Sequence, residues 1–250
     1  MTGKDKYFLG ALLLVYTLYR IAVLLKPFSE INGYAIPDDA YLSLDIARNF
    51  ANGKWFFYGE GTTSGFQPLY VFLMTPVFLI FKSDLITPVY VSIIIQNIFG
   101  FGTVYFMFRT LRNIFEDDYS PFLSVLLFIL LPVSIINMGN GLETSISFFF
   151  FLLVFYHLYK FRKEEFNKIT FRHLFILGVL VGISMLARID NIMVISAIVI
   201  WFITRGKGTK LFSQVLYFLA GSAVVYFPYM VLMYSFTGDF FPVSGKAVHH

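Results

Sequence analysis

Eight long apolar blocks, separated by short polar connections, constrain the fold of this chain more than any other feature of its sequence. The chain has 58% hydrophobic and 14% charged residues, which is more apolar surface than a soluble domain of 250 residues can bury. Because the apolar residues come in blocks and not in amphipathic stripes, we expect an all-α polytopic membrane protein. The blocks are residues 7–25, 67–81, 85–108, 121–137, 144–159, 171–187, 192–204 and 211–234.

Two of these blocks, 67–81 and 192–204, are short for a helix that crosses a bilayer, which needs about 20 residues. The distribution of Lys and Arg indicates which of them does not cross, because basic residues collect on the cytoplasmic side. If block 67–81 lies in the interface or re-enters the membrane, 12 of the 19 Lys and Arg residues share one face. They are Lys4, Lys6, Arg109, Arg112, Lys160, Arg162, Lys163, Lys168, Arg172, Arg205, Lys207 and Lys210. This arrangement predicts about seven crossings in the plasma membrane and a cytoplasmic N-terminus.

The first block predicts a permanent anchor and not a cleaved signal peptide. It is long for the apolar region of a signal peptide, it contains Arg20, and no small-residue cleavage site follows it before Lys26-Pro27. We therefore treat residues 1–250 as one transmembrane module.

The longest polar connection covers residues 26–66, and long ordered loops often carry function. Within it, Ala40, Leu44, Ala47 and Phe50 recur on one helical face, which predicts a helix lying on the membrane surface. The predicted topology places this loop on the outer side, before the non-crossing segment 67–81.

Asp38 and Asp39 stand at the start of this predicted helix. Adjacent carboxylates repel each other unless a proton, a cation or a hydroxyl shares the site. One of them could act as a general base, while the other binds a divalent cation such as Mg²⁺ or Mn²⁺ or orients the first. The alternative is structural: Asp38 caps the helix, and Asp39 interacts with its positive end.

Three further ionisable residues, Glu143, Arg188 and Asp190, fall on the same predicted outer face. Glu143 either faces a cavity or stabilises the start of the next helix. Arg188 suits a phosphate group, which it can bind through two parallel hydrogen bonds. The alternative is that Arg188 and Asp190 form only the polar hairpin that any two spans require.

Gln67, Lys246 and Arg20 are weaker candidates. Gln67-Pro68 opens the non-crossing block, and Pro68 suits the first turn of a helix. Lys246 is a candidate phosphate partner, with a merely solvated loop as the alternative. Arg20 is expected to snorkel toward the membrane boundary.

Several familiar chemistries are absent from the sequence. The chain has no Cys, no GxxxxGK[ST] phosphate loop, no HExxH and no GxSxG. The net charge of +4 lies in short clusters between apolar blocks, so membrane orientation explains it better than binding to nucleic acid.

An ordered set of motifs resembles the multispan GT-C glycosyltransferases, which take a sugar from a polyprenyl phosphate carrier. The set is Asp38-Asp39-Ala40-Tyr41, Ile46-Ala47-Arg48-Asn49, residues 63–70 (TSGFQPLY), Asn140-Gly141-Leu142-Glu143-Thr144, residues 186–190 (LARID) and residues 241–246 (FPVSGK). It is similar to the mannosyl- and arabinosyltransferase-like group. The resemblance implies a catalytic acidic motif at Asp38-Asp39, a module of about seven spans, and longer relatives than this chain, so we expect a truncated member.

These observations predict inverting transfer of a sugar from a polyprenyl phosphate donor to a hydroxyl group of a glycan, lipid or protein at the outer membrane face. Asp38 or Asp39 is the expected base. Gln67, Glu143, Arg188, Asp190 and Lys246 are the expected substrate-binding residues. The alternatives are a transporter or flippase for a lipid-linked sugar, and a noncatalytic subunit of a glycan-assembly complex. Transport predicts ionisable residues deep within the spans, whereas the charges gather at the boundaries, apart from Arg20 and His157.

Overall fold

The computed structural model describes residues 2–34, 36–161, 169–205, 210–240 and 242, and these are almost entirely helical. The elements are α1 (Gly3–Leu24), α2 (Phe28–Tyr34), α3 (Asp38–Ala51), β1 (Phe57–Tyr58), β2 (Gly61–Thr62), α4 (Pro68–Ile80), α5 (Thr87–Ile114), α6 (Tyr119–Leu130), α7 (Pro132–Asn137), α8 (Thr144–Phe161), α9 (Phe171–Ala187), η2 (Ile189–Asn191), α10 (Ile192–Arg205) and α11 (Lys210–Thr237). The two short strands form an antiparallel hairpin.

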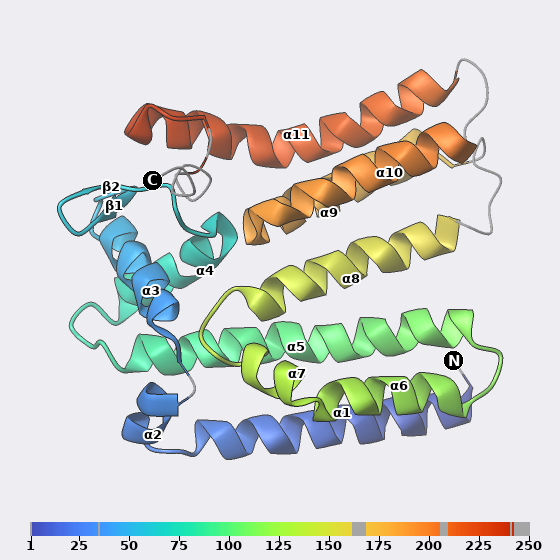
Figure 1. Ribbon diagram of the computed structural model, residues 1–250, viewed down its shortest axis with the longest axis horizontal. Coiled ribbons are helices and arrows are strands. Elements are labelled where there is room, and N and C mark those ends of the chain that lie inside the picture. Colours follow the sequence, from blue (N-terminus) through green and yellow to red (C-terminus); the bar gives the residue numbers. More distant parts are fainter. Residues whose placement is uncertain (1, 35, 162–168, 206–209, 241, 243–250) are drawn as a thin grey trace.

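The long helices run roughly along one direction, and the elements between α1 and α5 gather at one end of this bundle (Figure 1). Helices α1, α5, α8 and α11 are long and apolar enough to cross a membrane, and α4, α6 and α9 are shorter apolar helices. Large apolar side chains such as Leu18, Ile98 and Phe227 are exposed on their outer faces. The chain is therefore an integral membrane protein. The count of seven crossings stays a prediction, because α6, α9 and α10 are shorter than a typical span.

The apolar block 121–137 is not one continuous helix. Helix α6 ends at Leu130, and α7 begins at Pro132. Proline lacks an N–H and clashes with the carbonyl four residues earlier, so the helix stops before it and restarts with Pro132 in the first turn.

The described residues of the basic clusters lie at the other end of the bundle, which we call the basic end. Arg112 connects three segments there: its Nε is 2.8 Å from Asp5 Oδ1, and its Nη2 is 2.9 Å from Asp118 Oδ1. Tyr159 at the end of α8 donates a hydrogen bond to the Asn113 carbonyl over 2.7 Å. The predicted grouping of basic residues on one face therefore agrees with the packing. Arg162, Lys163, Lys168 and Lys207 lie outside the described residues.

Helices α9 and α11 pack closely through glycines. A methyl group at Gly178 would lie 2.0 Å from the carbonyl oxygen of Phe218, and one at Gly221 would lie 2.2 Å from that of Phe175. Ser222 donates a hydrogen bond from its hydroxyl to the Gly178 carbonyl over 3.1 Å. Small residues let the two backbones touch, which is a common way to pack helices in membranes.

The predicted helix in the first loop forms as α3, but its apolar face does not lie on the membrane. Ala40, Leu44, Ala47 and Phe50 are at most 5% exposed and belong to the same core as Tyr70 of α4. The apolar face of α3 packs on protein and not on lipid, because α4 covers it, and the interfacial position of the helix stays a prediction. At 13 residues, about 20 Å long, α4 is short for a bilayer core of about 30 Å. That length fits the predicted non-crossing segment.

Candidate active site

The acidic pair occupies the first turn of α3, and both carboxylates are exposed. Pro37 is the N-cap residue, and no side chain caps this helix. Asp38 lies inside the helix and does not cap it, which contradicts the capping alternative for this residue. Both carboxylates still stand at the positive end of the helix dipole, where acidic residues are common.

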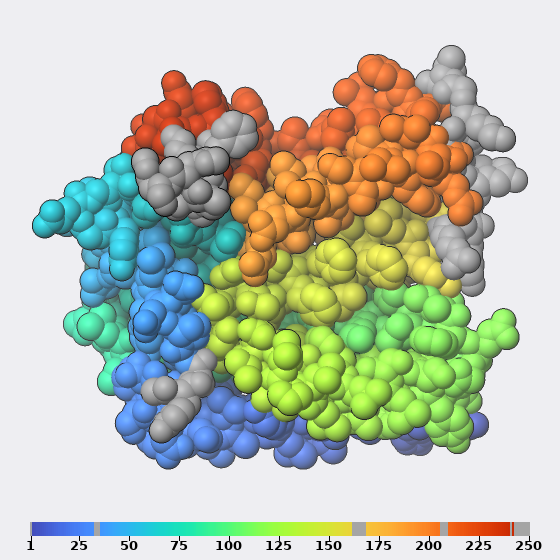
Figure 2. Space-filling model, viewed as in Figure 1, coloured from blue at the N-terminus to red at the C-terminus, as the bar shows by residue number. Residues whose placement is uncertain are grey.

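The loop before α8 runs directly beside α3. A methyl group at Gly141 would lie 3.2 Å from the Cβ of Ala40, and the φ angle of +80° at Gly141 is one that favours glycine. Two buried side chains fix this loop: Gln96 Oε1 accepts from the Gly141 N–H over 3.2 Å, and the Tyr70 hydroxyl donates to the Gly141 carbonyl over 2.5 Å. Figure 2 shows the surface of α3, in blue, next to the yellow-green surface that leads into α8.

Glu143, at the end of this loop, meets a residue from another helix. Its Oε1 is 3.7 Å from Nη1 of Arg188, which follows α9 directly. Arg188 also donates from Nε to Asp190 Oδ2 over 3.0 Å. The Glu143 side chain is only 10% exposed, whereas those of Arg188 and Asp190 are 45% and 72% exposed. The Arg188 side chain is therefore partly accessible from the solvent side.

The η2 turn that carries Asp190 is fixed by Asn191. Its Nδ2 donates to Ser147 Oγ of α8 over 3.1 Å and to the Ser184 carbonyl of α9 over 2.9 Å. Because these two bonds join the turn to both neighbouring helices, they hold Arg188 in place opposite Glu143.

Burial raises the pKa of the Glu143 carboxyl. Arg188 acts in the opposite direction, while the negative charges of Asp39 and Asp190 raise the pKa further. The negative charge of Asp39, in the first turn of α3, therefore acts on Glu143, which directly precedes α8. Asp38 acts elsewhere: together with burial, its charge raises the pKa of Tyr41.

Gln67 lies at the same end of the bundle, in a cavity of about 10 Å³ lined by residues that include Ile189, Tyr229 and Pro242. Within the described chain, Gln67 Oε1 and the Tyr229 hydroxyl are buried without a hydrogen-bond partner. The space is comparable to a single water molecule. Lys246 lies outside the described residues.

A metal site at Asp38 and Asp39 gains no further ligands from the fold. No group of three or more His, Cys, Asp or Glu side chains that could hold an ion occurs in the part of the chain that the structure describes. The structure thus groups Glu143, Arg188 and Asp190 by direct contacts, and Gly141 of the same loop packs against Ala40, which follows Asp38 and Asp39.

Sequence reasoning did not identify Gln96, Tyr70 and Asn191, which fix the two loops of the site. Gln96 was detectable, because it is a polar residue within an apolar block, and such residues need a buried partner. Tyr70 ends the quoted motif of residues 63–70 but was not singled out, and Asn191 gave no comparable signal, since Asn is ordinary in turns.

Arg20 belongs to neither the predicted boundary nor this site. It is 6% exposed and donates to the carbonyls of Ser134 and Ile135 in α7, over 3.3 and 3.1 Å. The snorkelling expectation is wrong because α7 supplies backbone acceptors within the protein.

Fold and site together define a helical membrane protein with a charged site at one end of its bundle. Residues 66–234, more than half of the chain, match the family model of dolichyl-phosphate-mannose-protein mannosyltransferases. The chain therefore belongs to this family and is a membrane-embedded glycosyltransferase of the GT-C type. A search of curated proteins found no match. The matched region contains Gln67, Glu143, Arg188 and Asp190, whereas Asp38 and Asp39 precede it.

Proposed function

We propose that this chain transfers a sugar from a polyprenyl phosphate donor to a hydroxyl group, with inversion at the anomeric carbon. The observation that carries the proposal is the pairing of Arg188 with Glu143 and Asp190 beside the start of α3, where Asp38 and Asp39 precede Ala40. The donor class is suggested by the family description, which names dolichyl phosphate mannose.

In the proposed reaction, the acceptor oxygen attacks the anomeric carbon from the side opposite the phosphate. The bond between this carbon and the phosphate oxygen breaks, and the lipid phosphate leaves with the bonding electrons. Asp39 or Asp38 takes the proton from the acceptor hydroxyl. Asp39 directly precedes Ala40, which packs against the loop that carries Glu143, and this position favours Asp39 as the base.

Arg188 is the proposed partner of the leaving phosphate. Its guanidinium is half exposed at a membrane boundary, and a planar guanidinium can bind two phosphate oxygens at once. Lys246 is a second candidate for this role. Glu143 and Asp190 keep Arg188 oriented, so that it need not reorganise as negative charge develops on the phosphate.

The topology proposed with this function has about seven crossings, a cytoplasmic basic end and a site on the outer side. Clustering of the basic residues at one end supports it, because cytoplasmic loops are enriched in Lys and Arg. A donor with a membrane-bound lipid chain can then present its sugar at the boundary where the site lies.

The experiment compares sugar transfer by the wild type with Asp39→Asn and Asp38→Asn, using purified membranes and a panel of labelled polyprenyl phosphate sugars. General base catalysis contributes about 100-fold to 10,000-fold, so loss of the base should lower the transfer rate on that scale. We expect Asp39→Asn to show this loss. Glu60→Gln, an exposed carboxylate of the same loop, is the matched control. Near-normal transfer by both Asn variants would refute the assignment of the base.

A further inference from the structure

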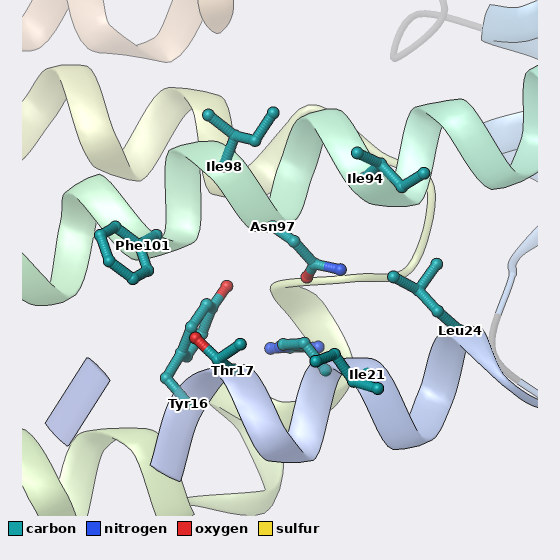
Figure 3. A pocket seen from close by; sticks show the side chains of 9 residues that line it. Tyr16, Thr17, Ile21, Leu24, Ile94, Asn97, Ile98 and Phe101 are labelled. Carbon is teal, nitrogen blue, oxygen red and sulfur yellow. The ribbon is translucent and has the colours of Figure 1, made fainter. Parts of the chain in front are cut away.

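A second polar site lies between α1 and α5, away from the acidic residues. Tyr16 and Arg20 of α1, together with Asn97 of α5, line a cavity of about 300 Å³. Figure 3 shows Tyr16 extending from α1 toward α5, and Asn97 extending from α5 toward α1. The remainder of the lining is mostly apolar and includes Leu24, Ile94 and Ile98.

Several polar atoms in this cavity have no hydrogen-bond partner among the described residues. Arg20 Nε, the Tyr16 hydroxyl and both polar atoms of the Asn97 amide are buried without a hydrogen-bond partner among the described residues. Tyr16 and Arg20 are only 4% and 6% exposed. Such groups are costly in an apolar environment, so the cavity favours a ligand that satisfies them.

The charge of Arg20 also lacks a counterion. The two hydrogen bonds of Arg20 go to neutral carbonyls. Its guanidinium lies over the rings of Tyr16 and Tyr19, 5.2 and 5.4 Å from their centroids. Arg20 forms no ion pair within the described residues. An anion that accepts several hydrogen bonds would complement Arg20, Tyr16 and Asn97 together.

Glycines make room for this arrangement. A methyl group at Gly100 of α5 would lie 1.8 Å from the Tyr16 hydroxyl, and one at Gly139 would lie 2.5 Å from Arg20 Nη1. The two polar side chains therefore fit against backbone, and their positions are fixed by the packing of α1 on α5 and on the loop before α8.

The apolar side of the cavity opens toward the surface that the bilayer covers. Ile94 and Ile98 are 44% and 65% exposed on that surface of α5. Arg20 stands four residues before the end of α1, so it lies about 6 Å from the helix terminus. A ligand with an anionic head and apolar chains would match both parts of the cavity.

We propose that this cavity binds a phospholipid of the surrounding bilayer, with its phosphodiester on Arg20, Tyr16 and Asn97 and an acyl chain along Ile94 and Ile98. The donor substrate is a poorer match, because the loop of residues 139–141 lies between this cavity and α3. Gly139 of that loop packs against Arg20, while Gly141 packs against Ala40. The proposal does not depend on the proposed glycosyl transfer.

Native mass spectrometry of the full chain in detergent tests this site, with phosphatidylglycerol and a diacylglycerol of the same chains as probes. We expect the wild type to retain phosphatidylglycerol and to release diacylglycerol, which lacks the phosphate. Arg20→Gln should lower the retention about tenfold, because a hydrogen-bonded charge is lost. Arg109→Gln, at the opposite end of α5, is the control and should retain the lipid like the wild type.

Tyr16→Phe and Asn97→Leu keep the bonds between Arg20 and α7, so they test the site even if Arg20→Gln folds poorly. Each should lower retention severalfold. Equal retention of diacylglycerol and phosphatidylglycerol would show a merely apolar groove and overturn the proposal. Displacement of phosphatidylglycerol by an equimolar polyprenyl phosphate would also overturn it, because the cavity would then belong to the carrier lipid. Unchanged retention of phosphatidylglycerol by Arg20→Gln, Tyr16→Phe and Asn97→Leu would also overturn the proposal.

Discussion

The pair formed by Glu143 and Arg188 predicts a stability difference that grows with pH. Arg188→Gln removes the positive charge that lies 3.7 Å from the buried Glu143 carboxylate. At about 4 Å, two charges interact by about 1 kcal/mol in water and about 4 kcal/mol at an effective dielectric constant of about 20. Because the Arg188 side chain is 45% exposed, solvent screening places the interaction near the lower value, at about 1–2 kcal/mol.

The direction of the pH effect follows from the raised pKa of Glu143. As the pH rises through this folded pKa, the buried carboxyl ionises and folding stability is lost. Arg188 offsets part of that loss. Below the pKa of the unfolded carboxyl, about 4.3, Glu143 is protonated in both states, and its pair with Arg188 contributes little. Arg188→Gln should therefore destabilise the protein little at pH 4 and by about 1–2 kcal/mol at pH 8.

Thermal unfolding in detergent at several pH values measures this difference. For a chain of this size, about 1–2 kcal/mol corresponds to a shift of the midpoint by roughly 2–8 °C. Asp190 also pairs with Arg188, so the Arg188→Gln effect must be repeated in a Glu143→Gln background, which isolates the coupling of the two residues. A difference that stays constant between pH 4 and pH 8, or that persists unchanged in the Glu143→Gln background, would refute the reasoning.

Two further predictions concern packing and topology. Gly178→Ala should lower the free energy of unfolding by about 2 kcal/mol or more, because its methyl group would clash with the Phe218 carbonyl oxygen at 2.0 Å. The control Gly10→Ala, which has open space at that position, should leave the free energy of unfolding unchanged. Unfolding in detergent measures both variants. Since the chain has no Cys, single cysteines at Asn52, Thr63 and Ser83 should react with an impermeant thiol reagent from outside intact cells, and one at Asn113 should not. Labelling of the cysteines at positions 63 and 83 from opposite sides of the membrane would mean that α4 crosses it.

The fold was predictable where one stretch of sequence contains the whole signal. Each apolar block forms helix. The helical spacing of Ala40, Leu44, Ala47 and Phe50 correctly predicts α3, because helix formation depends on local periodicity. The neighbour of α3 was not predictable, since lipid and protein both accept an apolar face. For the same reason, nothing in α9 alone indicates that Gly178 meets α11.

The site shows the same division. Asp39, Glu143, Arg188 and Asp190 were each recognisable as costly charges at a membrane boundary. Their grouping depends on how α3, the loop before α8 and the η2 turn pack, which no single motif encodes. Arg20 was misjudged because its acceptors in α7 lie more than one hundred residues away in the chain.

The close contact between α9 and α11 has a consequence for biosynthesis. Helix α10 lies between them in sequence, so α9 leaves the ribosome before the helix that it touches through Gly178 and Gly221. Until α11 is inserted, the groove that exposes Gly178 has only lipid against it. Helix α9 thus acquires its partner α11 last, whereas the hydrogen bonds of Asn191 to Ser147 and Ser184 need no part of α11. A ribosome stalled before α11 would hold a nascent chain that already contains Glu143, Arg188 and Asp190, but whose α9 still lacks the helix that covers Gly178.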